Sequence, residues 1–150
     1  MEKEKILSLL PYSKPFLFVD SITRIDENSI EGEYKFKKDE FFYTGHFKDF
    51  PVTPGVILTE TMAQIGVVCL GIFLLEDKIL SGKLPEVALV SNEVNFYLPV
   101  YPEEKVTVFA EKVFFRMGKL KCNVHMKNEK GEIVCKGIIA GVAKSSVKNE

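Results

Sequence analysis

The chain has 150 residues, of which 46% are hydrophobic and 27% charged, the balance of a soluble globular protein with room for one core. This composition argues against disorder, and a net charge of −1 gives no global field that would attract nucleic acid or an anionic membrane. The three cysteines are an odd number without Cys-x-x-Cys spacing, which argues against a disulfide framework or a zinc knuckle. We therefore expect a single cytoplasmic domain over residues 1–150, without a nucleic-acid partner.

The first third of the chain predicts a helix, two strands and a loop. A short amphipathic helix comes first and ends before Pro11. Residues 16–25 and 29–36 are rich in aromatic and β-branched side chains and predict strands, with a turn at residues 26–28 between them. Residues 37–55 contain several glycines, prolines and phenylalanines, which indicates an irregular but packed loop.

One long helix is predicted to follow this loop. Thr53 suits the N-cap and Pro54 the first helical position, where its missing N–H would have been unpaired anyway. Residues 56–75 are long enough to span a bilayer, but a charge such as Glu60 costs about 3 kcal/mol there on insertion scales. Because a helix buried in a small soluble core has the same pattern, we expect no membrane span.

The rest of the chain predicts strands and, with them, the fold. After a polar linker at residues 76–85, four segments have strand composition: 87–98, 105–115, 120–127 and 133–143. A helix that is apolar on nearly all sides needs a sheet that curls around it, so we predict an α+β protein with the hotdog fold. Such a sheet leaves an edge and an apolar flank uncovered, which predicts a homodimer or a higher homo-oligomer.

Two side chains are candidates for catalysis. His46 lies in the phenylalanine-rich loop, whereas the other histidine, His125, alternates with polar residues on the solvent side of a strand. Glu60 is the only charged residue of the long helix, with Gln64 one turn later on the same face. Burial would raise the pKa of Glu60 and suit it to donate a proton near neutral pH. A hydrogen-bonded loop histidine and a structural glutamate are the alternative interpretations at this point.

Gly55 adds a third group to this pair. As an early helical residue, its N–H points out of the start of the helix without a partner, where the helix dipole favours negative charge. Such a donor can stabilise a carbonyl oxygen that becomes an enolate, and one donor of this kind is worth about 3 kcal/mol of barrier. One histidine and one glutamate are too few ligands for a metal, so we expect no metal site and no cofactor.

These residues belong to a longer pattern. Three stretches resemble the (3R)-hydroxyacyl-[acyl-carrier-protein] dehydratases of bacterial fatty acid synthesis, which are hotdog proteins of the hydroxymyristoyl dehydratase type. The stretches are Pro15 to Asp20, Gly45-His46-Phe47 with Pro54-Gly55-Val56, and Glu60 with Met62-Ala63-Gln64. The spacing of fourteen residues from His46 to Glu60 and of nine from His46 to Gly55 also fits. The resemblance covers nearly the whole chain.

The resemblance implies a lyase that removes water from a 3-hydroxyacyl thioester on an acyl carrier protein and gives the trans-2-enoyl thioester. His46 would take the C2 proton, Glu60 would protonate the departing hydroxyl, and the Gly55 N–H would polarise the thioester carbonyl. His46 and Glu60 of one site would come from different subunits, and the acyl chain would lie in an apolar tunnel beside the central helix. We expect substrate contacts from four further residues: Phe47, Pro54, Val56 and Gln64.

The chain also departs from the pattern of this family. Tyr12-Ser13-Lys14 stands where the common sequence is His-Arg-Tyr, and residues 95–99 lack the basic side chains that help the usual enzymes meet an acidic carrier protein. These departures favour a specialised paralogue that serves polyene or other secondary acyl chains. Isomerising relatives usually have Asp at the position of Glu60, so the glutamate favours plain dehydration.

Two other functions fit the same fold. A hotdog thioesterase would direct water at the thioester carbon, but such enzymes generally lack the combined pattern of His46, Pro54-Gly55 and Glu60. A catalytically silent acyl-binding subunit of a heteromeric dehydratase is the second alternative, and the presence of both reactive residues argues against it.

Overall fold

The computed structural model describes residues 1–79 and 86–144 of the chain, and its main layer is one antiparallel sheet. Within these residues the sheet has six strands in the order β1-β2-β4-β5-β6-β3. The strands are β1 (Ser21–Ile25), β2 (Ser29–Lys35), β3 (Glu86–Phe96), β4 (Lys105–Arg116), β5 (Lys119–Lys127) and β6 (Ile133–Lys144). β1 and β3 are the edges of this sheet, so each has one side without a partner strand in the described chain.

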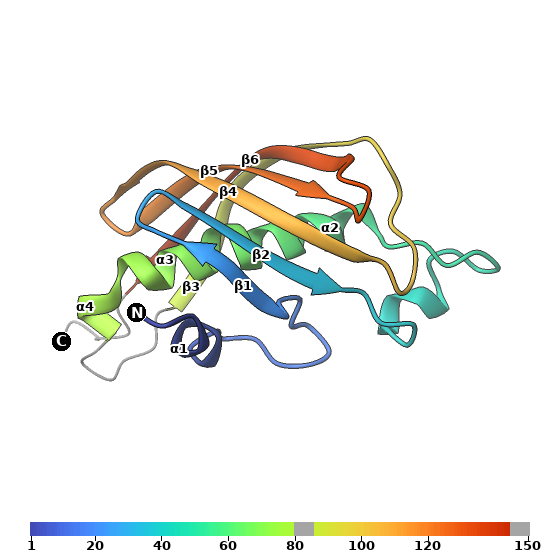
Figure 1. The fold of residues 1–150 in the computed structure, drawn as a ribbon, viewed down its shortest axis with the longest axis horizontal. Coiled ribbons are helices and arrows are strands. Elements are labelled where there is room, and N and C mark those ends of the chain that lie inside the picture. Colours follow the sequence, from blue (N-terminus) through green and yellow to red (C-terminus); the bar gives the residue numbers. More distant parts are fainter. Residues whose placement is uncertain (80–85, 145–150) are drawn as a thin grey trace.

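The sheet curls around one central helix (Figure 1). This helix consists of α2 (Gly55–Met62), a π-helical segment η2 (Ala63–Val68) and α3 (Cys69–Leu74). Its stretch Gly55–Leu74 has a mean hydropathy of 1.9 and is long enough to cross a membrane, but 78% of it is buried inside the fold. The prediction of a core helix is therefore confirmed, because the sheet covers the apolar surface that a bilayer would otherwise have to cover.

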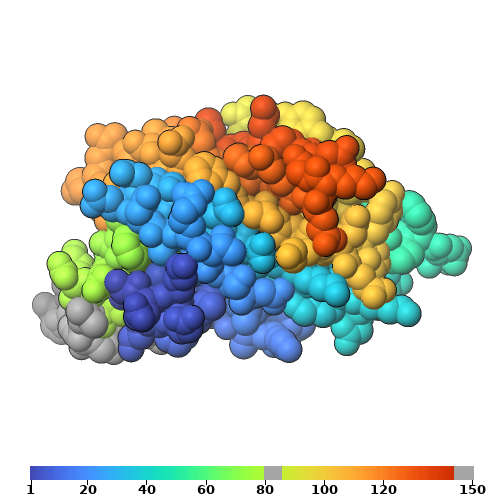
Figure 2. All heavy atoms as spheres, in the orientation of Figure 1, coloured from blue at the N-terminus to red at the C-terminus, as the bar shows by residue number. Residues whose placement is uncertain are grey.

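Short helical segments complete the described chain. α1 (Lys3–Ser8) contacts α3 and β1, the 3₁₀ helix η1 (Phe41–Thr44) lies in the loop before the central helix, and α4 (Glu76–Ile79) follows α3. In the view of Figure 2, α1 and the strands β1 and β2 lie in front of the central helix and cover its middle. The predicted linker is wrong for residues 76–79, which are helical, and its remainder at residues 80–85 lies outside the described residues.

The strand pattern places the core on the inner face of the sheet. Along β5, Leu120, Cys122, Val124 and Met126 are all buried, as their alternation with polar residues predicts. Cys69 and Cys135 are buried as well, and all three cysteines are free thiols. The hairpin turn at residues 128–131 is confirmed, since the Gly131 N–H donates to the carbonyl of Asn128 at 3.0 Å.

The predicted starts of the first strand and of the central helix are wrong, and tertiary contacts explain both differences. The strand predicted from residue 16 begins only at Ser21, because the side chain of Gln64 takes the carbonyl of Phe16 and the N–H of Phe18. The central helix begins at Gly55 with Pro54 as its N-cap and without a side-chain cap. The hydroxyl of Thr53, the predicted cap, is instead within 2.6 Å of the Tyr43 hydroxyl.

Two glycines of the central helix should respond in opposite ways to replacement by alanine. A Cβ at Gly66 would lie 2.9 Å from the Cβ of Ala110, whereas the nearest atom to a Cβ at Gly71 is Leu120 Cδ2 at 3.8 Å. We expect Gly66→Ala to lower the free energy of unfolding by about 1–3 kcal/mol through overpacking. Gly71→Ala should raise it by up to about 1 kcal/mol, because alanine restricts the unfolded chain more than glycine does.

Denaturant unfolding of the two variants measures this difference. Equal shifts of both midpoints would mean that the sheet does not approach the helix more closely at Gly66 than at Gly71.

Candidate active site

Glu60 lies in the second turn of α2, and a neighbour one turn along the helix holds its carboxyl group. The side-chain amide of Gln64 donates a hydrogen bond to Glu60 Oε2 at 2.8 Å. The amide nitrogen also donates to the carbonyl of Phe16 at 3.0 Å, and the amide oxygen accepts from the N–H of Phe18 at 2.8 Å. Both amide hydrogens of Gln64 are thus in use. The other carboxyl oxygen of Glu60, Oε1, accepts no hydrogen bond from residues 1–79 and 86–144 and can carry a proton.

Burial sets the protonation of this carboxyl group. Glu60 is half-buried, and removal of water raises its pKa above the ordinary value, while the hydrogen bond from Gln64 lowers it by a smaller amount. Among residues 1–79 and 86–144, no cationic side chain contributes to this shift. A carboxyl group without a cation nearby is more readily kept neutral, which is the state in which it can donate a proton.

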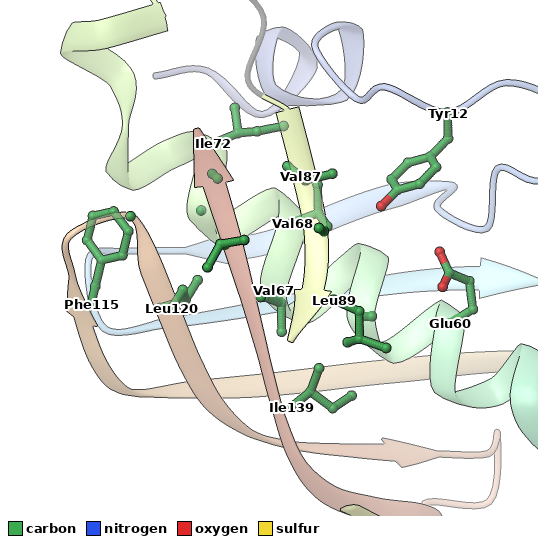
Figure 3. A pocket seen from close by; sticks show the side chains of 17 residues that line it. Tyr12, Glu60, Val67, Val68, Ile72, Val87, Leu89, Phe115, Leu120 and Ile139 are labelled. Atoms are coloured by element: carbon green, nitrogen blue, oxygen red, sulfur yellow. The ribbon is translucent and has the colours of Figure 1, made fainter. Parts of the chain in front are cut away.

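Glu60 faces an apolar pocket between the central helix and the sheet. Val67 and Ile72 of the helix, Leu89 of β3 and Leu120 of β5 line it, and Phe115 lies at the end away from Glu60 (Figure 3). Tyr12 lines the pocket at the same end as Glu60 (Figure 3). Sequence reasoning did not place Tyr12 in the site, although its departure from the family's histidine was a signal at this position.

His46 lies in a tightly closed loop before the central helix. Its N–H donates to the carbonyl of Phe42 at 3.1 Å, and its carbonyl accepts from the N–H of Val52 at 2.9 Å. The imidazole ring stacks on Phe47 with the ring centroids 4.1 Å apart. The backbone and one ring face of His46 are therefore fixed before any ligand arrives.

The ring nitrogens of His46 differ in their surroundings. Nδ1 lies 2.8 Å from the carbonyl oxygen of Val52. Because a carbonyl oxygen can only accept, Nδ1 carries the hydrogen of the neutral ring and Nε2 keeps its lone pair. This tautomer has the form that a general base needs, with Nε2 as the basic atom.

Gly55 begins the central helix, as the first residue after its N-cap. Among residues 1–79 and 86–144 its N–H has no hydrogen-bond acceptor, which is the usual state of a first-turn N–H. A Cβ at this position would lie 3.3 Å from the ring of Phe96, so the side chain that glycine lacks would crowd this ring.

The described chain does not bring all the predicted site residues together. The pocket of Glu60 is not lined by His46 or Gly55, nor by any of the four residues expected to contact substrate. Of these four, Phe47 and Val56 are exposed, whereas Pro54 is buried and the contacts of Gln64 are with Glu60 and the backbone. Their contact with a substrate stays a prediction. In the described part of the chain, no group of three His, Cys, Asp or Glu side chains is placed to hold a metal ion.

The fold and the site are those of a hotdog protein with a carboxyl group at the end of an apolar pocket. Comparison with known proteins then gives the family. Residues 10–140 match the family described as FabA-like domain, and the chain belongs to this family. The 3-hydroxyacyl-[acyl-carrier-protein] dehydratase FabZ of Caldicellulosiruptor saccharolyticus is 35% identical, with 88% of this chain and 91% of the relative covered. The corresponding dehydratase of Bacillus licheniformis is 32% identical, with 90% of each protein covered.

Solved structures confirm the hotdog fold. The dehydratase heterocomplex ApeI:P from Xenorhabdus doucetiae superposes with a TM-score of 0.79 at 11% identity, over 94% of this chain and 91% of that one. A thioesterase from Haemophilus influenzae superposes with a TM-score of 0.67 at 15% identity, over 100% and 95% of the two chains. At these identities the likeness establishes the shared fold and does not separate one activity from the other.

The raised pKa of Glu60 predicts how stability depends on pH. Between pH 4.5, the ordinary value, and the higher folded-state value, the folded protein binds a proton that the unfolded chain releases. The contribution of this carboxyl group to stability is therefore fully present below pH 4.5 and is lost as the pH rises through the folded-state pKa.

Glu60→Gln removes this titration and keeps the shape of the side chain. We expect the free energy of unfolding of the wild type, relative to that of the variant, to fall as the pH rises from 4.5, in denaturant titrations at a series of pH values. A relative stability that rises over this range would contradict burial as the dominant influence on Glu60.

Proposed function

We propose that the protein removes water from a 3-hydroxyacyl thioester and yields the trans-2-enoyl thioester. The observation that carries this proposal is a carboxyl group of raised pKa, Glu60, at the polar end of an otherwise apolar pocket. A hydroxide ion is a poor leaving group, so its departure from C3 requires a proton donor at that oxygen. An aliphatic chain beyond C3 would fit the apolar remainder of the pocket.

The proposed reaction is balanced in protons and electron pairs. The Nε2 atom of His46 takes the C2 proton, and the C2–H electron pair becomes the new bond between C2 and C3. The C3–O bond breaks and its oxygen takes the proton of Glu60, so that one water molecule leaves. The Gly55 N–H donates to the thioester oxygen, which bears negative charge while the C2 proton is removed. Proton transfer from His46 back to Glu60 restores the enzyme.

A second copy of the chain would complete this site. β3 is an edge strand of eleven residues that lines the pocket of Glu60, and it exposes large apolar side chains, with Leu89 55% and Val90 47% exposed. An edge of this kind is covered by another chain or gives rise to aggregation. We infer that β3 of a second copy lies beside it, and that the partner's loop brings its His46 to the Glu60 of this chain.

We further infer that the substrate is carried by an acyl carrier protein, as the names of the curated relatives state for those enzymes. The chain would act as a single-domain cytoplasmic homodimer. A hotdog thioesterase is the second candidate, because a thioesterase shares the fold. The identity of 31–37% to curated dehydratases favours dehydration over it.

Purified protein incubated with a 3-hydroxyacyl carrier protein should form the enoyl product, seen by its ultraviolet absorbance, without release of free thiol. His46→Ala and Glu60→Ala should each lower kcat by at least about a hundredfold, because each removes one of the two proton transfers. Phe73→Leu, in the same central helix but at a residue that does not line the pocket, is a control for effects of helix substitution on folding. Release of thiol without enoyl product would instead establish a thioesterase.

The two inactive variants also test whether the site is shared. If His46 and Glu60 act across subunits, a mixture of His46→Ala and Glu60→Ala chains contains heterodimers with one intact site. We expect partial recovery of enoyl formation after subunit exchange, followed with differently tagged chains. Absence of recovery in a mixture that demonstrably contains heterodimers would mean that both residues of a site belong to one chain.

A further inference from the structure

Among the described residues that line the pocket beside the central helix, two have polar side chains. Of the 17 residues that line it, all except Tyr12 and Glu60 are aliphatic residues, glycine or phenylalanine. The two lie near one another at the same end of the pocket, far from Phe115 (Figure 3), and the charge of Glu60 acts on the Tyr12 hydroxyl. The pocket therefore has a polar head and an apolar body, which matches an aliphatic chain with one polar substituent near its head.

One network positions both polar side chains. Gln64 binds the carboxyl group of Glu60 directly, and it also binds the backbone of the segment that follows Tyr12, at Phe16 and Phe18. The N–H of Phe16 donates to the carbonyl of Ser13 at 2.8 Å, which closes the turn next to Tyr12. Tyr12 is therefore held against the same helix that carries Glu60, and does not lie there as part of a free N-terminal segment.

The Tyr12 hydroxyl is available to a ligand. Within the described part of the chain the hydroxyl makes no hydrogen bond. Every fully buried polar side-chain atom described there has a partner, so the Tyr12 hydroxyl is not fully buried, and Tyr12 lines the pocket. Burial, and then the charge of Glu60, raise the pKa of Tyr12 further above neutral pH. Tyr12 thus stays protonated and can always act as a donor.

Two neutral donors side by side recognise an oxygen atom with two lone pairs. We propose that Tyr12 is a specificity-determining residue whose hydroxyl donates a hydrogen bond to the 3-hydroxyl oxygen of the substrate, beside the donor Glu60. This inference rests on the proposed dehydration, and it adds a contact that selects hydroxylated chains. Acyl chains without the hydroxyl would leave both donors unpaired in an apolar pocket, which disfavours their binding.

Unreactive probes separate this contact from turnover. Two pantetheine thioethers with an eight-carbon chain, one with a hydroxyl at C3 and one without, lack the carbonyl that makes the C2 proton acidic, so neither can react. Calorimetric titration of the dimeric protein with each probe gives the ratio of the two Kd values. We expect the wild type to bind the hydroxylated probe more tightly, and Tyr12→Phe to lower this preference about five- to tenfold, the loss of one hydrogen bond.

Ile72→Val is the matched control, because Ile72 lines the apolar body of the same pocket. It should weaken the binding of both probes equally and leave their ratio unchanged. Tyr12→Phe should unfold at the wild-type temperature, since the lost hydroxyl has no partner among residues 1–79 and 86–144. A wild type without preference for the hydroxylated probe, or a Tyr12→Phe variant with the wild-type ratio, would overturn the assignment.

The same measurements distinguish failure of this inference from failure of the proposed function. Enoyl formation by the wild type, together with an unchanged probe ratio in Tyr12→Phe, would contradict the role of Tyr12 alone. A ratio that depends on Tyr12 in a protein that forms no enoyl product would support the hydroxyl contact and contradict dehydration.

Discussion

The buried amide of Gln64 is the contact on which the arrangement of the site depends. It is completely buried and joins three groups: the carboxyl of Glu60, the carbonyl of Phe16 and the N–H of Phe18. A buried amide that lost one of these partners would leave a polar group unpaired in the core, at a cost of about 1–3 kcal/mol. The contacts therefore tie the N-terminal segment to the central helix and hold the carboxyl group at the pocket at the same time. The π-helical turns begin at Ala63, directly before Gln64, and such turns are frequent at functional sites.

Desolvation gives the pocket its chemical character. It raises the pKa of both Glu60 and Tyr12, and the hydrogen bond to the carboxyl group comes from the neutral amide of Gln64. Because no cationic side chain of the described residues lines this apolar pocket, both groups favour their neutral, hydrogen-donating forms. The pocket thus combines a surface that excludes water with donors that would act on a hydroxyl oxygen, and neither feature needs a metal ion or a cofactor to function.

The described chain is incomplete as a catalytic unit in the proposed reaction. His46 has its basic nitrogen prepared by the hydrogen bond of Nδ1 to Val52, yet it does not line the pocket of Glu60. The edge strand β3 lines the pocket and exposes apolar side chains, Leu89 and Val90 among them. A second chain on this edge would bury the exposed apolar surface, and it would also supply His46, the base that the pocket lacks. Stability and activity would then depend on the same interface.

The sequence by itself determined the type and order of most elements and the identity of the candidate residues. Alternation in β5 and the apolar stretch of the central helix are local periodic signals, and the resemblance located His46, Gly55 and Glu60 through their spacing. The same signals failed at Phe16 to Phe18, where side chains typical of a strand lie on a backbone that binds the Gln64 side chain instead of another strand.

Only the tertiary structure decided the position of Tyr12 beside Glu60 and the separation of His46 from that pocket. It also distinguished Gly66, which must stay small against Ala110, from Gly71, which has room. The physical reason is the range of the contacts. Gln64 is 46 and 48 positions away from its two backbone partners, and no periodicity within a single segment carries information over such a distance.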